Sequence, residues 1–282
     1  MKRIYGTELG ILPGDNPLLT RTLKDALYKM QGKQNVSLLL EPGEYHFYPQ
    51  YAAMDSFWIS NHHKCAERAV AFLLKKMEDF EIDGAGSRFI FHTDILPFYI
   101  HESNGIRLKN FSVDYHIPAY SEGEIVSVST QKMVVKINPE MYKWQVKDNY
   151  LYFSGENYCY PLHLCMEMDK VSGGPAYGTD DLYFCTSEQK VGLHPEIEKI
   201  DFDKVCFTLY GEERFYSDSK KGNKLVLRHH PRSNPAFYAS DSNHLEFEKI
   251  TVHHAEGMGI LAERCTDISL FEFNVLLDEN NP

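Results

Sequence analysis

The chain has 282 residues, of which 43% are hydrophobic, and its formal net charge is −11 at pH 7. A chain of this length can bury a sizeable core, as one large domain or two. The negative charge argues against a nucleic acid as partner, because binding to a phosphate backbone needs a basic surface. The sequence has no apolar run of about 18 residues and no apolar signal-peptide core near Met1. It therefore predicts no membrane contact and a cytoplasmic protein, unless a leader has been removed.

The six cysteines form no recognisable framework. No two of them are spaced Cys-x-x-Cys, so neither a zinc site nor a disulfide scaffold is indicated. No Ser-His-Asp spacing, phosphate-binding loop or metal motif is visible either. We therefore expect no metal and no cofactor. The cysteines are expected to be scattered buried thiols, at Cys65, Cys159, Cys165, Cys185, Cys206 and Cys265.

The first elements predicted along the chain are a helix and a pair of strands. Residues 18–30 carry apolar residues at helical spacing, with Thr20 or Thr22 as the N-cap. Residues 36–47 read as a strand, a Pro-Gly turn and a second strand. A helix at this place would cap the open end of a stack of strands and protect its edges. Residues 56–63 are expected to form a polar loop.

A coil motif follows, in three clear copies and one weaker copy. Residues 104–114, 243–253 and 267–275 each combine a polar turn with four apolar residues, separated by steps of two, three and two positions. This is the pattern of two short strands joined by a bend. The last two copies are about 23 residues apart, and a weaker copy at 80–92 contains a tight glycine corner at 83–87. The repeat predicts a right-handed parallel β-helix, and a β-sandwich is the alternative.

Between about residues 118 and 230 the pattern changes. Alternating strands separated by turns predict an antiparallel β-barrel or sandwich inserted between two coils. The expected domains are an N-terminal cap with the first coils over 1–117, the inserted domain over 118–230, and further coils over 231–282. A coil stack that ends on its repeat exposes an apolar end and unpaired strand groups. The sequence therefore predicts the N-terminal part of a longer protein.

Four segments resemble a known family. They are Gly-Glu-Tyr-His-Phe-Tyr (43–48), Phe-Trp-Ile-Ser-Asn-His (57–62), Ile-Asp-Gly-Ala-Gly-Ser-Arg-Phe-Ile-Phe-His (82–92) and Thr-Val-His-His-Ala-Glu-Gly-Met-Gly-Ile-Leu-Ala (251–262). In this order they are similar to the α-1,3-galactosidases of glycoside hydrolase family 110, and the resemblance runs over nearly all of the chain. It implies a β-helix with an inserted β-barrel, galactose-terminated glycans as partners, and metal-independent hydrolysis with inversion of configuration.

The resemblance also places the catalytic aspartates outside this chain. In the family they follow the Ala-Glu-Gly-Met-Gly motif, one in a motif that resembles Ala-Asp-Ala-Thr-His and another in an Asp-Asp pair before Asn-Val-His. Neither motif occurs before Pro282, and Asp180-Asp181 lacks the flanking residues. We therefore expect the catalytic residues beyond Pro282. Inverting hydrolysis needs two carboxyl groups roughly 6.5–9.5 Å apart, a spacing that coils about 4.8 Å apart can supply.

Three candidate site residues come from the coil copies themselves. Aligning the copies puts His92, Asp114 and His253 at equivalent positions, each directly after the last buried residue. We expect them to form an outward ladder that lines the substrate, in which an imidazole–carboxylate contact tunes a proton donor. The alternative is an ordinary solvated polar row.

Three further candidates lie after the insertion. His254 and Glu256 belong to a loop that also holds two glycines, and they are candidates for galactose binding, with turn stabilisation as the alternative. Arg232 ends a basic stretch at the exit of the insertion. An arginine there can hydrogen-bond sugar hydroxyls or remain a surface cation. The loop at 60–63 is a weaker candidate for substrate contact.

Two other functions fit part of this pattern. A non-catalytic carbohydrate-binding β-helix would keep the groove and lack the acid and the base. A pectin-lyase-like enzyme would need a calcium site of clustered carboxylates and a basic residue that takes a proton. The sequence shows no such cluster.

Overall fold

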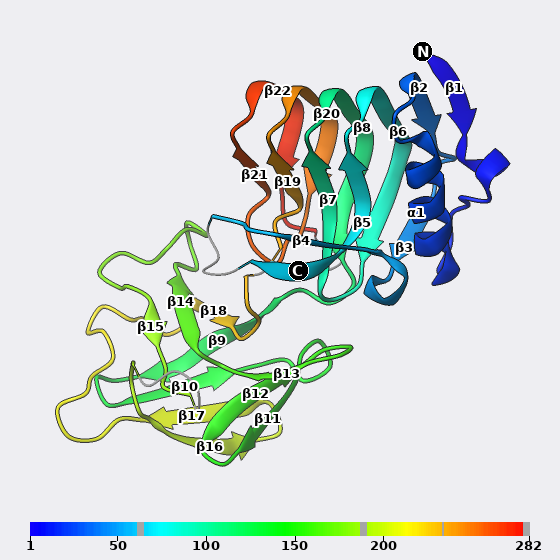
Figure 1. Ribbon diagram of the computed structural model, residues 1–282. Helices are drawn as coiled ribbons and strands as arrows, with labels where there is room; N and C mark the ends of the chain where they lie inside the picture. Colours follow the sequence, from blue (N-terminus) through cyan, green and yellow to red (C-terminus); the bar gives the residue numbers. More distant parts are fainter. Residues whose placement is uncertain (61–64, 187–190, 233, 279–282) are drawn as a thin grey trace. The chain divides into compact units, whose positions relative to one another are not determined.

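The protein is built mainly from β-strands and divides into two compact units (Figure 1). The computed structural model describes residues 1–60, 65–186, 191–232 and 234–278. The first unit comprises Met1–Pro118 and Arg232–Pro282, and the second comprises Ala119–Pro231. Each unit has its own hydrophobic core.

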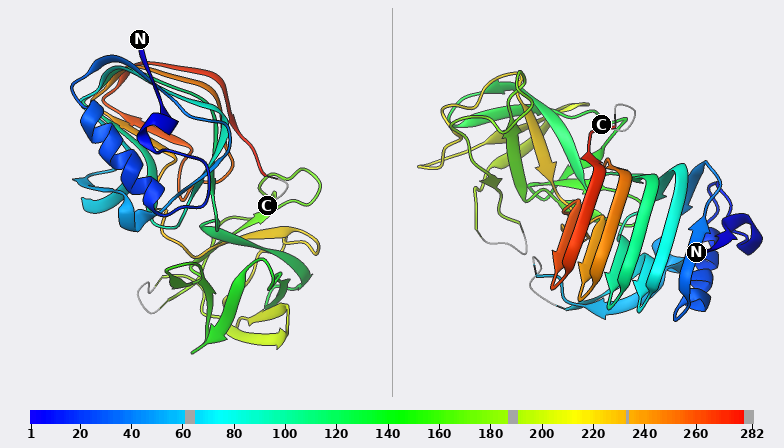
Figure 2. Two further views of the ribbon diagram at one scale, coloured as in Figure 1. Left: turned by 90° about the vertical axis from the view of Figure 1, so that its right-hand side faces the viewer. Right: turned by 90° about the horizontal axis from the view of Figure 1, so that it is seen from above.

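The first unit contains a sheet in which every strand pair is parallel. Its order is β1, β2, β6, β8, β20, β22, and β3 pairs with the distal half of β6. In the view from above in Figure 2 the long strands lie side by side in one layer. The strands are β1 (Lys2–Tyr5), β2 (Gln34–Leu39), β3 (Glu44–Phe47), β6 (Glu78–Phe91), β8 (Asn104–Tyr115), β20 (Asn243–Val252) and β22 (Thr266–Val275).

A second sheet of the same unit has the order β21, β19, β7, β5, β4. Its pairs are parallel except for the edge pair of β4 and β5, which is antiparallel. The strands are β4 (Ala53–Phe57), β5 (Ala66–Lys75), β7 (Ile95–His101), β19 (Phe237–Ser240) and β21 (Ile260–Glu263).

Stacked phenylalanines from both sheets fill the core of the first unit. The ring of Phe98, on β7, lies 4.3 Å from that of Phe72 and 4.7 Å from that of Phe237. On the other sheet, Phe89 and Phe111 stack with their centroids 4.6 Å apart. The alternation that placed these residues on one face in the sequence therefore directs them inward, as period-two patterns do.

The strand register gives the number of residues between neighbouring strands of the parallel sheet. Glu81 on β6 pairs with Arg107 on β8, 26 residues later. Arg107 pairs in turn with Glu246 on β20, 139 residues later. The whole second unit, Ala119–Pro231, lies within this longer interval, and without it the two steps are equal. In the sequence the second unit thus lies between two strands that pair in the first unit, β8 and β20.

The last step is slightly shorter. Asn243 on β20 pairs with Thr266 on β22, 23 residues later, and the Thr266 hydroxyl donates to Asn243 Oδ1 at 2.6 Å. This is the interval that the sequence repeat predicted.

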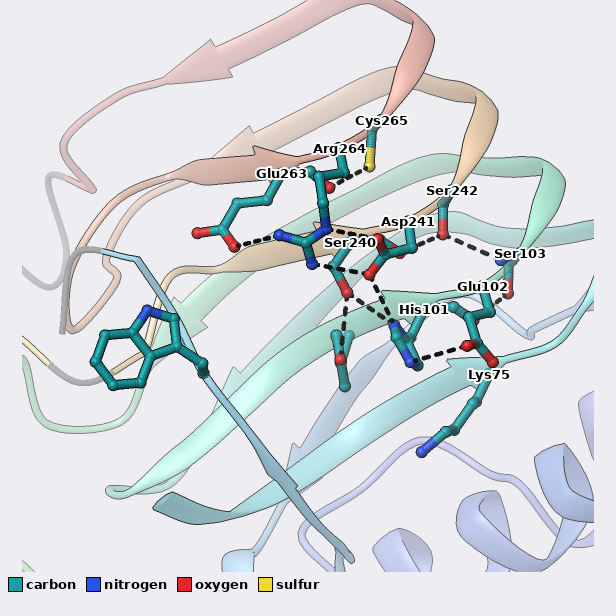
Figure 3. Close-up of polar contacts among 12 residues, drawn as sticks. Lys75, His101, Glu102, Ser103, Ser240, Asp241, Ser242, Glu263, Arg264 and Cys265 are labelled. Carbon is teal, nitrogen blue, oxygen red and sulfur yellow. Dashed lines mark hydrogen bonds and ion pairs between the residues drawn. The ribbon is translucent and has the colours of Figure 1, made fainter. Parts of the chain in front are cut away.

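The corners between the two sheets repeat one backbone conformation. Lys76, Glu102, Asp241 and Arg264 each have φ between 48° and 54°, and each directly follows a strand of the second sheet. Serine hydroxyls satisfy backbone amides at these corners: Met77 N donates to Ser103 Oγ at 3.0 Å, and Ser103 N donates to Ser242 Oγ at 3.1 Å. Figure 3 shows the second of these contacts, between Ser103 and Ser242, among the polar side chains at the corners.

The helix α1 (Leu18–Met30) packs its apolar side into the core of the first unit. Its bounds match the predicted range, but the predicted N-cap is wrong. Pro17 is the N-cap, and Asn16 Oδ1 accepts a hydrogen bond from Leu18 N at 3.1 Å. Thr20 is instead buried, and its hydroxyl accepts a hydrogen bond from Tyr48 N at 2.8 Å. Among the described residues, no helix has the length and hydrophobicity needed to cross a membrane.

The glycine segment predicted as a corner is a bulge inside β6. The register of β6 jumps from Asp83 to Ser87 while β8 advances only from Lys109 to Phe111. Ala85 and Gly86 take positive φ of 52° and 83°. At Gly84 an added Cβ would lie 2.7 Å from Phe111 Cβ, so only glycine permits this approach.

The named strands of the second unit pair antiparallel, as their alternation predicted. One isolated bridge, between Phe184 and Leu193, is parallel. Its larger sheet has the order β15, β14, β18, β9, β10, β17, β16, and its smaller sheet the order β11, β12, β13. The strands are β9 (Tyr120–Val128), β10 (Lys132–Lys136), β11 (Lys143–Lys147), β12 (Tyr150–Ser154), β13 (Cys159–Pro161), β14 (Leu164–Met168), β15 (Leu182–Tyr183), β16 (Glu196–Asp201), β17 (Lys204–Thr208) and β18 (Lys224–Arg228).

Two smaller predictions need correction. The loop expected over residues 56–63 begins later, because Ser56 and Phe57 end β4, and residues 61–64 lie outside the described part. The cysteines are all free, but Cys65 and Cys159 are exposed, so not all of them are buried thiols.

Candidate functional site

A row of charged side chains crosses the parallel sheet near the ends of β3, β6 and β8. Glu44 pairs with Arg88 in the strand register, and Arg88 Nη1 lies 3.3 Å from Glu44 Oε2. Arg88 Nη2 lies 3.3 Å from Asp114 Oδ2 and 3.0 Å from Asp278 Oδ2. The guanidinium therefore joins three carboxylates, and 44% of the Arg88 side chain remains exposed. We call Glu44, Arg88, Asp114 and Asp278 the arginine cluster.

Asp114 is the buried anchor of the arginine cluster. Only 1% of the residue is exposed, and both carboxylate oxygens are engaged. Oδ1 accepts hydrogen bonds from Tyr115 N at 2.8 Å and from His254 Nδ1 at 2.7 Å. A buried carboxylate is tolerated when its oxygens are hydrogen-bonded and paired with a cation. Asp114 therefore fixes both Arg88 and the buried His254.

A row of three histidines lies beside the arginine cluster. His46 Nδ1 and His92 Nε2 are 3.0 Å apart. The ring of His92 is stacked between Tyr48, at 3.8 Å, and His116, at 4.9 Å. His46 also connects to the arginine cluster, because its Nε2 lies 3.0 Å from Glu44 Oε1. We call His46, His92 and His116 the histidine row.

One acidic side chain from the N-terminal segment reaches the histidine row. The Tyr48 hydroxyl donates a 2.5 Å hydrogen bond to Asp15 Oδ1. This hydrogen bond, together with the charges of His46, His92 and His116, lowers the pKa of the Asp15 carboxyl below its ordinary value, while burial opposes the change. Asp15 is therefore a carboxylate at neutral pH.

The structure corrects the predicted ladder of His92, Asp114 and His253. Asp114 pairs with Ile90, and the hydrogen bond from His116 N to Phe91 O continues this register, so His116 is level with His92. The bulge in β6 lengthens that strand relative to β8, which shifted the alignment of the weaker sequence copy. Asp114 is also buried instead of facing outward.

His253 does occupy the position that follows the paired residues Val113 and Val252. Its backbone N–H donates to Val113 O at 2.9 Å, which places it level with Asp114. Its ring Nδ1 lies 3.0 Å from Leu276 O. The side chain that reaches Asp114 is therefore that of His254, one residue further along the chain.

Glu256 belongs to a separate buried cluster in the first unit. Its Oε1 accepts from Asp94 N at 2.9 Å, and its Oε2 accepts from Asn234 Nδ2 at 2.6 Å. Arg68 Nη1 in turn donates to Asn234 Oδ1 at 3.4 Å. Burial lowers the pKa of the Arg68 guanidinium, and the charge of Glu256 opposes this. These contacts to backbone and amide groups are those expected of the turn-stabilising alternative.

The remaining candidates lie apart from the arginine cluster. Arg232 is exposed, and its carbonyl approaches Gly257, where an added Cβ would lie 3.3 Å away. In the weaker loop candidate, Ser60 N donates to Glu263 Oε1 at 2.8 Å, and residues 61–63 lie outside the described part.

Sequence reasoning missed Arg88, Glu44, His46 and His116. A signal for the histidine row was present. Tyr48, His92 and His116 each follow a buried aromatic residue, namely Phe47, Phe91 and Tyr115. Aligning these aromatic pairs would have set the register across the bulge.

Comparisons with known proteins show relatives over nearly the whole chain. Residues 121–226 match the GLAA-B beta-barrel domain I family. The chain is 29% identical over 276 residues to alpha-1,3-galactosidase A of Shewanella woodyi, covering 97% of this chain and 44% of that protein. It is 30% identical over 277 residues to alpha-1,3-galactosidase B of Parabacteroides distasonis, covering 95% and 43% respectively. The chain thus spans less than half the length of these relatives.

One similarity to a solved structure is far weaker. The Gp54 tailspike of Acinetobacter baumannii bacteriophage AP22, in complex with A. baumannii capsular saccharide, aligns over 96% of this chain and 35% of the tailspike. The sequence identity is 13% and the TM-score is 0.20, so the alignment carries no argument about fold or ligand.

Proposed function

This chain is homologous to the α-1,3-galactosidases of glycoside hydrolase family 110, and we propose that it is a galactosidase-like glycoside hydrolase chain that binds terminal α-1,3-linked galactose. The observation that carries the proposal is the similarity to proteins named α-1,3-galactosidase over 95% to 97% of this chain. Galactose-terminated glycans are the proposed partners.

The proposed architecture is a right-handed parallel β-helix that carries an inserted antiparallel β-barrel. The equal steps from β6 to β8 and, without the second unit, from β8 to β20 support it. So does the match of residues 121–226 to a family described as a β-barrel domain. We propose a cap with the first coils over residues 1–117, the inserted domain over 118–230 and further coils over 231–282.

We propose the exposed side of the arginine cluster as the surface that meets the sugar. A guanidinium offers five N–H donors in a rigid fork, which suits adjacent sugar hydroxyls. Glu44, 48% exposed, supplies acceptor oxygens beside Arg88. On the buried side, Asp114 pairs with the guanidinium of Arg88, and His254 holds Asp114 in place through a hydrogen bond. This arrangement keeps the donors in one orientation before a ligand arrives, which reduces the entropy lost on binding.

Asp114 is assigned a positioning role in this proposal. Inverting hydrolysis needs an acid that reaches the leaving oxygen and a base that reaches a water, roughly 6.5–9.5 Å apart. Asp114 offers neither, because it is buried and both its oxygens already accept hydrogen bonds. The runner-up function is a non-catalytic carbohydrate-binding protein, which would need the arginine cluster but no acid and no base.

A hydrolysis assay separates the two functions. The purified chain is incubated with galactosyl-α-1,3-galactose, and free galactose is measured against a heat-killed control and against the β-1,3-linked isomer. Release from the α-linked sugar alone, with the β-anomer of galactose appearing first in the proton NMR spectrum, is the result expected of an inverting α-galactosidase. Binding without release, by a chain that is folded by circular dichroism, supports either a hydrolase whose catalytic residues lie outside residues 1–282 or the carbohydrate-binding function. The same assay on a longer chain separates these two. If the folded protein neither binds nor hydrolyses the sugar, both functions are contradicted.

A further inference from the structure

Three side chains from separate segments of the first unit converge on one point. Asp15 lies in the segment before α1, His46 lies on β3, and His92 directly follows β6. One ligand atom from each residue lies within 4.8 Å of the other two. We propose that Asp15, His46 and His92 form a binding site for a divalent transition-metal ion, with Zn²⁺ as the ion that fits best.

The spacing of the two histidine nitrogens fits zinc coordination. Tetrahedral zinc with Zn–N bonds of about 2.0–2.1 Å holds two imidazole nitrogens about 3.3 Å apart. His46 Nδ1 and His92 Nε2 are 3.0 Å apart, so a shift of a few tenths of an ångström admits the ion between them. Two imidazoles and one carboxylate form a donor set that zinc accepts, and water completes the coordination. Asp15 is exposed, so the ion has a path of entry.

The groups around the three ligands already hold them in place. Glu44 Oε1 lies 3.0 Å from His46 Nε2, the nitrogen opposite the one that faces the site. A carboxylate in this position fixes the ring and makes the metal-facing nitrogen a better donor. The Tyr48 hydroxyl fixes Asp15, and the stacking of Tyr48 and His116 on both faces of His92 fixes that ring. The carboxylate of Asp15 supplies the anionic ligand.

A metal ion here would fasten the N-terminal segment to the first coils. Two hydrogen bonds already link them: Gly14 N donates to Glu44 O at 2.6 Å, and the Tyr48 hydroxyl donates to Asp15 Oδ1 at 2.5 Å. An ion bound only by the folded chain stabilises it in proportion to ln(1 + [ion]/Kd). The role is structural and separate from the metal-independent hydrolysis that the family resemblance implies.

The test is a calorimetric titration of Zn²⁺ into the full chain, purified without a polyhistidine tag and treated with chelator, together with a thermal melt. We expect one ion per chain and a melting temperature raised by about 5 °C or more at 100 times the Kd. His46→Asn, Asp15→Asn and His92→Phe, which preserves the ring stack, should each weaken binding at least about 10-fold. Glu44→Gln, which keeps the side-chain shape, should weaken it by about 10- to 100-fold.

His244→Asn is the matched control, because His244 is an exposed histidine of the same parallel sheet and is not one of the three proposed ligands. This variant should bind Zn²⁺ as the unmodified chain does. Circular dichroism establishes that each variant is folded. Absence of binding up to about 1 mM Zn²⁺, well above the affinity range of structural zinc sites, would overturn the proposal. The proposal would also be overturned if the His46→Asn and His92→Phe variants bound Zn²⁺ as tightly as the unmodified chain. That result would assign the ion to other groups, such as the exposed thiols of Cys65 and Cys159.

Discussion

His254 donates a 2.7 Å hydrogen bond to Asp114, although 140 residues separate the two in the sequence. The second unit, residues 119–231, accounts for most of that separation. Both side chains are 1% exposed. The contact therefore ties the segment before the second unit to the segment that follows it. It also holds the carboxylate that orients Arg88.

Removal of the Asp114 carboxylate should destabilise the first unit. Asp114→Ala leaves the buried His254 without this acceptor and removes one carboxylate from Arg88, and leaving a buried polar group without its hydrogen bond costs about 1–3 kcal/mol. The measurement is the free energy of unfolding in urea. Asp241→Ala is the matched control, because its pair with Arg264 is exposed and such pairs contribute about 0–1 kcal/mol. Equal losses in the two variants would contradict the buried role of Asp114.

Gly84→Ala tests the bulge in β6. The added methyl would lie 2.7 Å from Phe111 Cβ and 2.8 Å from Asn110 O, so the strands must separate, at a cost of about 1–3 kcal/mol. Gly259→Ala is the control in the same unit, because its new methyl meets Val275 at an ordinary 3.4 Å. A thermal melt of both variants checks the prediction. If Gly84→Ala melts no lower than the control, the close approach of β6 and β8 is refuted.

Acid should destabilise the second unit through His229. Burial lowers the pKa of His229 from an ordinary 6.5 to about 3, with smaller contributions from His230 and His163. Between pH 6.5 and 3 the unfolded chain binds a proton that the folded chain does not, so the free energy of unfolding falls as the pH falls through this window. The slope approaches about 1.4 kcal/mol per pH unit.

The measurement uses the fluorescence of Trp144 in a Trp58→Phe background, because the chain has two tryptophans and Trp144 lies in the second unit. Urea unfolding is followed from pH 7 to pH 4. His229→Gln retains a side chain that can hydrogen-bond Ser121, the partner of His229 Nε2 at 3.0 Å. In this variant the slope of the free energy of unfolding between pH 6.5 and 4 should decrease by about 1.4 kcal/mol per pH unit, which corresponds to one proton. An unchanged slope would show that other groups bind the proton.

The sequence predicted the repeated strands, the helix and the antiparallel strands between residues 118 and 230 because each depends on local periodicity. The apolar residues of β8, β20 and β22 alternate in register, and the same copies pair in the structure. Predicting the histidine row required the strand register beyond the bulge between Asp83 and Ser87. The additional residues of the bulge break the period of two, so alternation alone does not give that register. The contact between Asp114 and His254 was also missed, since it depends on register across the whole insertion.

The most direct test of the account is a calorimetric titration of galactosyl-α-1,3-galactose into the unmodified chain, Arg88→Met and Arg107→Met. Arg107 is the matched control, because it lies on the same sheet and bridges the carboxylates of Glu81 and Glu246. The account predicts that Arg88→Met weakens binding at least about 10-fold, the effect of losing charge-assisted hydrogen bonds worth about 1.5–3 kcal/mol, and that Arg107→Met binds normally. Equal affinity in the Arg88→Met variant and the unmodified chain would contradict the assignment of this surface to the sugar.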